Sequence, residues 1–310
     1  MAGIWVYSED AVLAKEMVTL AKELAKTNNQ PIGAVTLCED TAKELTALGV
    51  QKAIVLKGNS AWAEAYEQAL ADTLAAEGAS IVLIGGTVSG KYTAAKAAAR
   101  LDAGLATDAT KVSLEGDEVV IERIIYGGLA VSTEALSYPA FVTIPPRSYD
   151  ISAEAASSGE VIVKEVTVDP KVTVGATAKI ERQGVDISKA EKAVGVGRGV
   201  GNQEDLAMIQ ALADAIGAEV GCTRPIAEDA KWFPIDRYIG ISGKIFKGSL
   251  YIGVGTSGQI QHVSGIRDSK VVVAINTDEN APIFAAADYG IVGNYAEIVP
   301  ALTAAIKQAK

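Results

Sequence analysis

Short apolar runs alternate with amphipathic stretches along the first third of the chain. Four strand-sized runs stand out: Ile4–Tyr7, Ile32–Leu37, Ala53–Leu56 and Ile81–Ile84. Between the first two runs, apolar residues recur at helical spacing: Leu13, Met17, Leu20 and Leu24. Continuous apolar strands that alternate with helices are typical of a parallel sheet covered on both faces. This pattern predicts an α/β fold for the first part of the chain.

The pattern changes from Lys111 onward. Two extended stretches, Lys111–Leu114 and Val119–Tyr126, flank the turn sequence Glu115-Gly116-Asp117, which predicts a β-hairpin. Further extended pieces follow at Ala140–Ile144 and Val161–Val168. We therefore expect this domain to end with antiparallel additions to its sheet.

A polar stretch without a sustained apolar face, Lys179–Lys192, predicts a linker. A second α/β pattern follows it. The expected elements are strands Ala193–Val196, Glu219–Cys222, Leu250–Val254 and Val271–Ile275, a helix over Glu204–Ile216 and a last helix from Tyr295. We place an N-terminal α/β domain at residues 1–188 and a C-terminal α/β domain at residues 189–310, each a mostly parallel sheet with flanking helices. The length of 310 residues agrees with two domains of roughly 150 residues each.

Composition excludes several classes of function. Apolar residues make up 49% of the chain and charged residues 21%, which excludes wholesale disorder. The formal net charge of −10 argues against a nucleic-acid-binding protein. A single histidine and two cysteines leave too few ligands for a Cys/His zinc site, so no metal is expected. The sequence contains no bilayer-spanning stretch and no signal-peptide pattern at its start, so we expect a cytoplasmic protein without membrane insertion.

One glycine-rich segment resembles a phosphate-binding loop. The sequence GGTVSGK over Gly85–Lys91 matches most of the pattern G-x-x-x-x-G-K-[ST]. Tyr92 stands where the pattern needs the hydroxyl residue that binds Mg²⁺. We interpret the segment as a strand-to-helix turn in preference to an ATP site.

A second glycine-rich segment, GVGRGVG, lies between a predicted strand and a predicted helix. Its closely spaced glycines allow backbone N–H groups to approach an anionic phosphate, and Arg198 adds a positive charge. The NAD fingerprint G-x-G-x-x-G is absent, because Val200 or Asn202 stands where the third glycine is needed. The segment therefore predicts an anion site without identifying the cofactor.

A third glycine-rich segment, GVGTSGQIQHVSG, follows another predicted strand. Ser257 is expected to cap a helix that starts there, with His262 about one turn inside it. Arg224, Ser242 and Asn276 lie in loops of the same half of the chain. The carboxyl ends of strands in an open parallel sheet meet at one crevice, so these loops together favour a dinucleotide site. No G-x-S-x-G elbow or acid–base pair is recognisable, and we predict no catalytic residue.

Six blocks over residues 193–293 resemble a known family. They are GRGVGNQEDL, EVGCTRPIAED, RYIGISGK, LYIGVGTSGQIQH, VVVAINTDENAPIF and ADYGIVG. In this order they are similar to the α subunit of electron-transfer flavoproteins, most of all the bacterial branch associated with carnitine metabolism and nitrogen fixation. GGTVSGKYTAAKAAARLDAGLATDAT and YGGLA resemble the first domain of that family, so the resemblance covers the whole chain.

The resemblance implies a Rossmann-like C-terminal domain that binds FAD, and a heterodimer with a β subunit. It implies an electron carrier, in place of an enzyme that converts a substrate, with an acyl-CoA dehydrogenase-type redox partner. The positions that match the cofactor-contacting residues of the family are Arg198, Thr223, Arg224, Ile239, Gly240, Ile241, Ser242, Ser257, Gly258, Gln259, Ile260, Gln261, His262, Asn276 and Asn294.

Some of these positions carry implied roles and departures. Arg224 matches the arginine beside the flavin ring, and His262 is implied to donate a hydrogen bond to flavin O2. Ile241 replaces a glutamine of the family and removes an amide that could contact the ring. Asn294 stands where the family often has aspartate near the adenosine ribose.

Other functions remain open at this point. The chain could be a nucleotide-binding oxidoreductase or an ATP-using enzyme, although the broken glycine motifs count against both. It could also be a scaffold that FAD stabilises without redox activity. Within the family, an NADH-dependent electron-bifurcating flavoprotein remains open, because bifurcation depends on a second flavin site shared with the β subunit.

Overall fold

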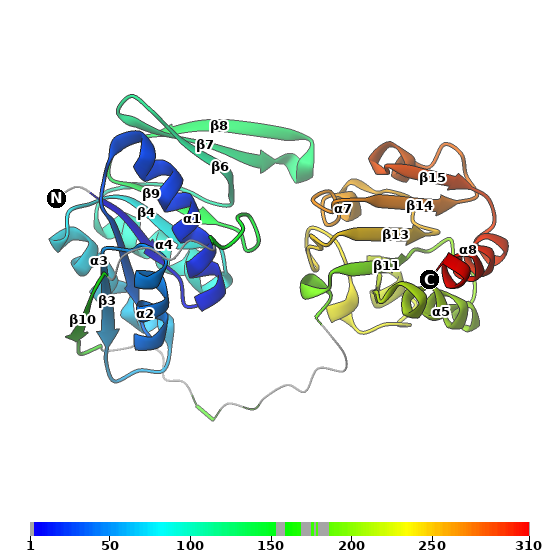
Figure 1. The fold of residues 1–310 in the computed structure, drawn as a ribbon, viewed down its shortest axis with the longest axis horizontal. Helices are drawn as coiled ribbons and strands as arrows, with labels where there is room; N and C mark the ends of the chain where they lie inside the picture. Colours follow the sequence, from blue (N-terminus) through cyan, green and yellow to red (C-terminus); the bar gives the residue numbers. More distant parts are fainter. Residues whose placement is uncertain (1–2, 153–158, 169–174, 177, 179–185, 310) are drawn as a thin grey trace. The chain divides into compact units, whose positions relative to one another are not determined.

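The structure is a computed structural model that describes residues 3–152, 159–168, 175–176, 178 and 186–309. The chain forms two compact units (Figure 1). Unit 1 comprises Met1–Ile125 and Ala130–Ala178, and unit 2 comprises Tyr126–Leu129 and Lys179–Lys310. Residues 179–185 of the predicted linker Lys179–Lys192 lie outside the described residues. The domain boundary predicted after residue 188 therefore stays a prediction.

Unit 1 is built on a seven-stranded sheet with the strand order β10-β3-β2-β1-β4-β9-β5, and each neighbouring pair is parallel. The strands are β1 (Gly3–Tyr7), β2 (Ile32–Thr36), β3 (Lys52–Lys57), β4 (Ala79–Gly85), β5 (Gly104–Ala106), β9 (Ala140–Ile144) and β10 (Glu160–Glu165). From β1 the chain first builds to one side through β2 and β3, and then returns to place β4 on the other side. The direction of winding therefore reverses between β1 and β4.

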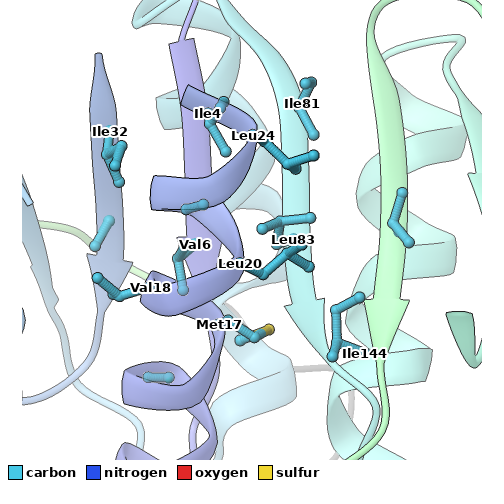
Figure 2. Packing of buried hydrophobic residues seen from close by; sticks show 14 of the residues in the cluster. Ile4, Val6, Met17, Val18, Leu20, Leu24, Ile32, Ile81, Leu83 and Ile144 are labelled. Carbon is cyan, nitrogen blue, oxygen red and sulfur yellow. The ribbon is translucent and has the colours of Figure 1, made fainter. Parts of the chain in front are cut away.

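Helices cover both faces of this sheet. They are α1 (Ala11–Asn28), α2 (Glu39–Ala47), α3 (Glu67–Ala76) and α4 (Val88–Arg100), with a 3₁₀ turn at Ala63–Tyr66. Figure 2 shows Met17, Leu20 and Leu24 of α1 packed on strand residues such as Ile4 and Leu83. A second apolar cluster, on the other face, joins the alternate strand residues to α3 and α4. The predicted parallel sheet with two covered faces is confirmed for unit 1.

Three antiparallel strands form a separate sheet in unit 1. They are β6 (Ala109–Glu115), β7 (Glu118–Ile125) and β8 (Ala130–Leu136), in that order. The predicted hairpin at Glu115-Gly116-Asp117 is confirmed, but the expected antiparallel additions to the main sheet are wrong. β9 and β10 join the main sheet as parallel strands. All five residues of β9 are buried, which suits the interior of a parallel sheet, whereas β8 alternates between half-buried and exposed positions.

Unit 2 contains a five-stranded sheet with the order β12-β11-β13-β14-β15, again with parallel neighbours. The strands are β11 (Lys192–Val196), β12 (Glu219–Cys222), β13 (Leu250–Val254), β14 (Val272–Asn276) and β15 (Tyr289–Val292). The helices are α5 (Leu206–Ile216), α6 (Arg224–Glu228), α7 (Ile260–Val263) and α8 (Tyr295–Ala309). The four predicted strands are confirmed to within one residue, and the expected helix from residue 204 begins as a 3₁₀ turn, Gln203–Asp205.

The two faces of the unit 2 sheet are covered differently. The long helices α5 and α8 pack on one apolar cluster that includes Val194, Ile252 and Val254. The opposite face carries a second cluster in which loop residues such as Ile239 and Phe246 cover Tyr251 of β13.

The predicted fold class, α/β with two mostly parallel sheets and flanking helices, is confirmed. In unit 2, the chain passes from β11 to β12 on one side and then to β13 on the other side of β11. The winding therefore reverses between β11 and β13, and ligands of open α/β sheets bind at the carboxyl ends of strands at such a point. Among the described helices, none is both long and apolar enough to cross a bilayer.

Candidate cofactor site

Two glycine turns meet at the point where the winding of unit 2 reverses. The turn after β11 hydrogen-bonds to the turn after β13, through Gly197 N to Val254 O at 2.8 Å and Gly199 N to Gly255 O at 2.9 Å. A Cβ on Gly197 would lie 2.2 Å from Gly255 O, so a side chain cannot be accommodated there. Gly201, in the same motif, faces open space. The glycines at the contact therefore serve a close backbone approach.

The turn after β13 exposes backbone donors. Among the described residues, the N–H groups of Ser257, Gly258 and Gln259 form no hydrogen bond. Gly258 has φ +84°, and its Cβ position lies 2.1 Å from Ile283 N, so glycine is required for both reasons. Ile283 N donates to Ser257 O at 3.1 Å and holds the turn in place. Unpaired backbone N–H groups in a glycine-rich turn form a concave site for an anion.

Arg198 provides a positive charge beside these donors, in the turn after β11. Its side chain is exposed, and within the described part of the chain it forms no ion pair and no hydrogen bond. The turns at the winding reversal thus combine unpaired N–H groups with an unpaired guanidinium. This combination suits a phosphate group.

The cap expected at Ser257 is wrong. Helix α7 begins at Ile260, and Gln259 stands at its N-cap without a side-chain hydrogen bond. The left-handed backbone at Gly258 turns the chain away from a helical path, so the helix starts after it. Ser257 and Gly258 therefore belong to the donor-rich turn and not to a helix.

His262 lies in α7 and is buried, with 6% of its surface exposed. Its Nδ1 lies 3.0 Å from the carbonyl oxygen of Ile239, and its Nε2 lies 2.8 Å from the hydroxyl of Tyr251. Burial lowers the pKa of His262 to about 4, although the bond to the Ile239 carbonyl works in the opposite direction. The ring is therefore neutral at pH 7, with its proton on Nδ1, because a carbonyl can only accept.

This arrangement differs from the donor role that the resemblance implies for His262. Nδ1–H donates to Ile239, and Nε2 accepts from Tyr251, so the neutral ring has no further N–H for a cofactor. A hydrogen bond from His262 to flavin O2 requires the ring to leave these partners.

The predicted segment Ile239–Ser242 lies against Gln261 and His262. Ile241 N donates to Gln261 O at 2.9 Å, in addition to the bond between Ile239 and His262. The hydroxyl of Ser242 lies 2.8 Å from that of Tyr238. The side chain of Ile241 is 48% exposed, so it offers an apolar surface next to this junction.

Asn276 connects two neighbouring loops. Its Nδ2 donates to Thr256 O at 2.8 Å, and its Oδ1 accepts from Asp278 N at 3.0 Å. Asn294 lies after the next strand, where its Oδ1 accepts from Ala296 N at 3.0 Å near the start of α8. Asn276 thus fixes the turn after β13, whereas the ribose contact implied for Asn294 stays a prediction.

Thr223 and Arg224 follow β12, on the other side of β11. Thr223 N donates to Val196 O at 2.9 Å, and its buried Oγ1 has no partner among the described residues. Arg224 is exposed, and its Nε lies 2.7 Å from Glu228 Oε2. The hydrogen bond that Arg224 donates to Glu228 raises the pKa of the Arg224 guanidinium. No hydrogen bond or ion pair within the described residues joins the Arg224 side chain to the other predicted site residues.

Sequence reasoning missed Tyr251, whose side chain is fully buried and whose hydroxyl bonds to His262. A signal was present in the neighbouring strand. A Cβ on Gly195 in β11 would lie 1.9 Å from the Tyr251 hydroxyl. A glycine inside a strand marks the close approach of another group, so Gly195 indicated a large neighbour.

The fold and the site together indicate a class of protein. A doubly wound parallel sheet with a cationic glycine turn at the winding reversal is typical of proteins that bind nucleotide cofactors. Residues 186–267 match the electron transfer flavoprotein FAD-binding domain, and residues 5–170 match the electron transfer flavoprotein domain. The chain belongs to the electron-transfer flavoprotein α-subunit family and is of the FixB type.

Several curated relatives are similar over nearly the whole chain. Protein FixB of Escherichia coli O6:K15:H31 (strain 536 / UPEC), of Escherichia coli O157:H7 and of Shigella flexneri are each 40% identical over 310 residues. Each match covers 98% of this chain and 97% of the relative. The resemblance stated from the sequence is thereby confirmed, as are the electron-transfer flavoprotein role and FAD as the cofactor of its C-terminal domain type.

Proposed function

We propose that this chain holds FAD at the carboxyl ends of β11 and β13 and transfers electrons as a heterodimer with a β subunit. The observation that carries the proposal is the group of unpaired donors at the winding reversal, the N–H groups of Ser257, Gly258 and Gln259 with Arg198. FAD contains a pyrophosphate with two negative charges, which such donors neutralise. The residues present therefore fit the cofactor.

FAD supplies the redox chemistry, because its ring takes up and releases electrons. The chain binds and orients it. We assign the pyrophosphate to Arg198 and to the turn 257–259, with Asn276 fixing that turn through Thr256 O. Ile260 and Gln261 would continue this cradle into α7.

We assign the flavin ring to the segment Ile239–Ser242 and to Thr223 and Arg224. The exposed apolar side chain of Ile241 suits a ring face, and the hydroxyl of Ser242 suits a polar ring edge. The charge of Arg224 would favour a reduced and more negative ring. The Glu228 carboxylate offsets part of that charge in the present arrangement.

The remaining assignments concern the adenosine end and the partners. Asn294 would hydrogen-bond the adenosine ribose through its Nδ2, since its Oδ1 accepts from Ala296 N. The redox partner would be an acyl-CoA dehydrogenase-type protein, and the heterodimer would work in the cytoplasm. We further propose that residues 1–188 supply the β-subunit interface and residues 189–310 hold FAD.

The test is co-expression of this chain with a β subunit of the same family, followed by a visible spectrum and a nucleotide count. We expect a yellow complex that releases FAD on denaturation. A complex that stays colourless after reconstitution with FAD would overturn the proposal. One FAD plus AMP would indicate simple electron transfer, whereas two flavins would indicate the electron-bifurcating subtype.

A further inference from the structure

Two hydrogen bonds join three buried groups on the loop-covered face of the unit 2 sheet. Tyr251 of β13 is fully buried, and its hydroxyl lies 2.8 Å from Nε2 of His262. On the other side of the ring, Nδ1 lies 3.0 Å from the carbonyl oxygen of Ile239. These hydrogen bonds thus connect a strand of the sheet to the segment that we assign to the flavin ring.

The direction of each hydrogen bond follows from the chemistry of the partners. The Ile239 carbonyl can only accept, so Nδ1 carries the proton of the neutral ring. Nε2 then has a lone pair, and the Tyr251 hydroxyl is the donor to it. Burial lowers the pKa of His262 to about 4 and raises the pKa of Tyr251, so both groups are neutral at pH 7. Within the described residues, no ion pair reaches either group.

The sheet itself dictates the position of the hydroxyl. The Tyr251 hydroxyl lies over Gly195 of β11, where a Cβ would be 1.9 Å away. The rings of Phe246 and His262 lie beside the phenol, with centroid distances of 6.2 Å and 5.9 Å. The Tyr251 phenol therefore has little freedom to move, and the same holds for the His262 imidazole that is hydrogen-bonded to it.

We propose that Tyr251 is a positioning residue of the FAD site: its hydroxyl donates to Nε2 of the His262 tautomer that the Ile239 carbonyl selects, and so holds the ring and Ile239–Ser242 against α7. This inference rests on the proposed function, because it assumes that FAD contacts these segments. Under this arrangement His262 supplies geometry to the site, and the hydrogen bonds to the cofactor come from the groups assigned above. The bond from Ile241 N to Gln261 O is the second link across the same junction.

The tautomer can be measured directly, because the chain contains a single histidine. ¹⁵N-histidine labelling of the full chain gives one pair of imidazole nitrogen signals, which belong to His262. In the wild type we expect a protonated Nδ1 and an unprotonated Nε2 at neutral pH, and no protonation of the ring until the pH approaches about 4. An Nε2–H tautomer in the wild type would overturn the inference, whatever the variants do.

The variant Tyr251→Phe removes the hydroxyl and keeps the ring. We expect the Nδ1–H tautomer to persist through its bond to Ile239, with a protonation midpoint nearer the ordinary 6.5 of histidine and FAD binding about fivefold weaker. The matched control is Tyr7→Phe in unit 1, since the buried Tyr7 hydroxyl has no hydrogen-bond partner among the described residues. The control should leave the His262 signals and FAD binding as in the wild type. Tyr251→Phe with the wild-type protonation midpoint and the wild-type affinity for FAD would overturn the inference.

The two measurements separate this inference from the proposed function. If the wild type binds no FAD, the proposed function fails, and the positioning role fails with it. If FAD binds but His262 carries its proton on Nε2, only the positioning role fails. If Tyr251→Phe does not fold, the wild-type Nε2 signal still decides the question, because a hydrogen bond from the Tyr251 hydroxyl displaces that signal from the position of a free imine nitrogen.

Discussion

The two units place the same architecture around very different turns. In both, a parallel sheet reverses its winding between two central strands. A glycine-rich turn follows one of these strands in unit 1 (β4) and both of them in unit 2 (β11 and β13). In unit 1, carboxylates occupy the turns: Asp10 accepts from the N–H groups of Val12 and Leu13 at 2.8 and 3.2 Å, and Glu9 accepts from the Thr87 hydroxyl. In unit 2, the corresponding turns, residues 197–201 and 255–259, contain no carboxylate and carry the exposed Arg198.

The segment GGTVSGK shows the same difference, because its lysine is neutralised by a carboxylate. Lys91, the expected phosphate ligand of such a loop, lies 2.7 Å from Asp108. A Cβ on Gly90 would lie 1.9 Å from Gly85 O, so this glycine serves the packing of α4 on β4. The interpretation as a strand-to-helix turn is confirmed. Glycine-rich turns and unpaired N–H groups alone therefore do not distinguish a cofactor site, because among the described residues the N–H groups of Thr87, Val88 and Ser89 also form no hydrogen bond. The sign of the nearby charge does distinguish it.

The largest expected effect on stability and FAD binding comes from adding a side chain where the two unit 2 turns touch. Gly197→Ala places a Cβ 2.2 Å from Gly255 O, where backbone atoms have to move. We expect the free energy of unfolding of unit 2 to fall by about 3 to 4 kcal/mol and FAD binding to be lost. Urea unfolding and flavin titration measure both.

The matched control for that substitution is Gly201→Ala in the same motif, because nothing lies within 4 Å of its Cβ position. Its effect on stability should stay within about 0.5 kcal/mol. Equal effects of the two substitutions would show that the close approach of the turns is not what requires glycine.

The next effect is acid sensitivity confined to unit 2. The folded state holds His262 neutral with a pKa of about 4, while the unfolded chain takes up a proton near the ordinary value of 6.5. The contribution of the neutral ring is thus complete above pH 6.5 and is lost as the pH falls towards 4, by up to about 3 kcal/mol. The measurement is the difference in unfolding free energy between the wild type and His262→Gln from pH 7 to pH 4, in which the common carboxylates cancel. A difference that does not change with pH contradicts the burial of a neutral ring.

A smaller effect is expected when unit 2 receives an acidic turn like that of unit 1. Arg198→Glu replaces the unpaired cation with a carboxylate, so FAD should bind about 30-fold more weakly. The control Lys43→Glu makes the same change in net charge on the exposed surface of α2. Both affinities come from flavin fluorescence titration. Similar losses in the two variants would mean that overall charge, and not the turn, governs binding.

The smallest effect belongs to Lys91→Ala in unit 1. The partners of its ion pair with Asp108 are nearly half exposed, so we expect a loss of at most about 1 kcal/mol in stability and unchanged FAD binding. Calorimetry with Mg²⁺-ATP should give no binding heat in the wild type or in the variant. Binding of ATP that disappears in Lys91→Ala would favour the interpretation of GGTVSGK as a phosphate-binding loop. The two units would then no longer differ in whether their glycine-rich turns bind an anion.

Much of the fold followed from local patterns. Buried runs such as Ile81–Ile84 have no polar alternation, and only a sheet covered on both faces accommodates them. The misplacement of Ala140–Ile144 arose because a preceding hairpin suggested antiparallel pairing, whereas strand direction depends on where the chain returns to the sheet. Pairing of this kind is a property of distant segments, which local periodicity does not record.

The site was predictable to the level of its turns. Arg198 and the glycines stood out because their chemistry is local to the sequence. The predicted helix cap at Ser257 was wrong because Gly258 has a left-handed backbone and packs against Ile283. Ile283 lies far along the chain, so local sequence does not reveal this contact. The partner of His262 was missed for the same reason, since Tyr251 reaches it through the packed interior.

The backbone seam between Gly197, Gly199 and Gly255 has a consequence for how such a protein varies over time. Because no side chain stands at the contact, hydrogen bonds of 2.8 and 2.9 Å set the spacing of the two turns. Apolar residues elsewhere in unit 2 can be exchanged and repacked without altering that spacing. The spacing of the two turns therefore depends on these three glycines and not on which apolar residues fill the core of the domain.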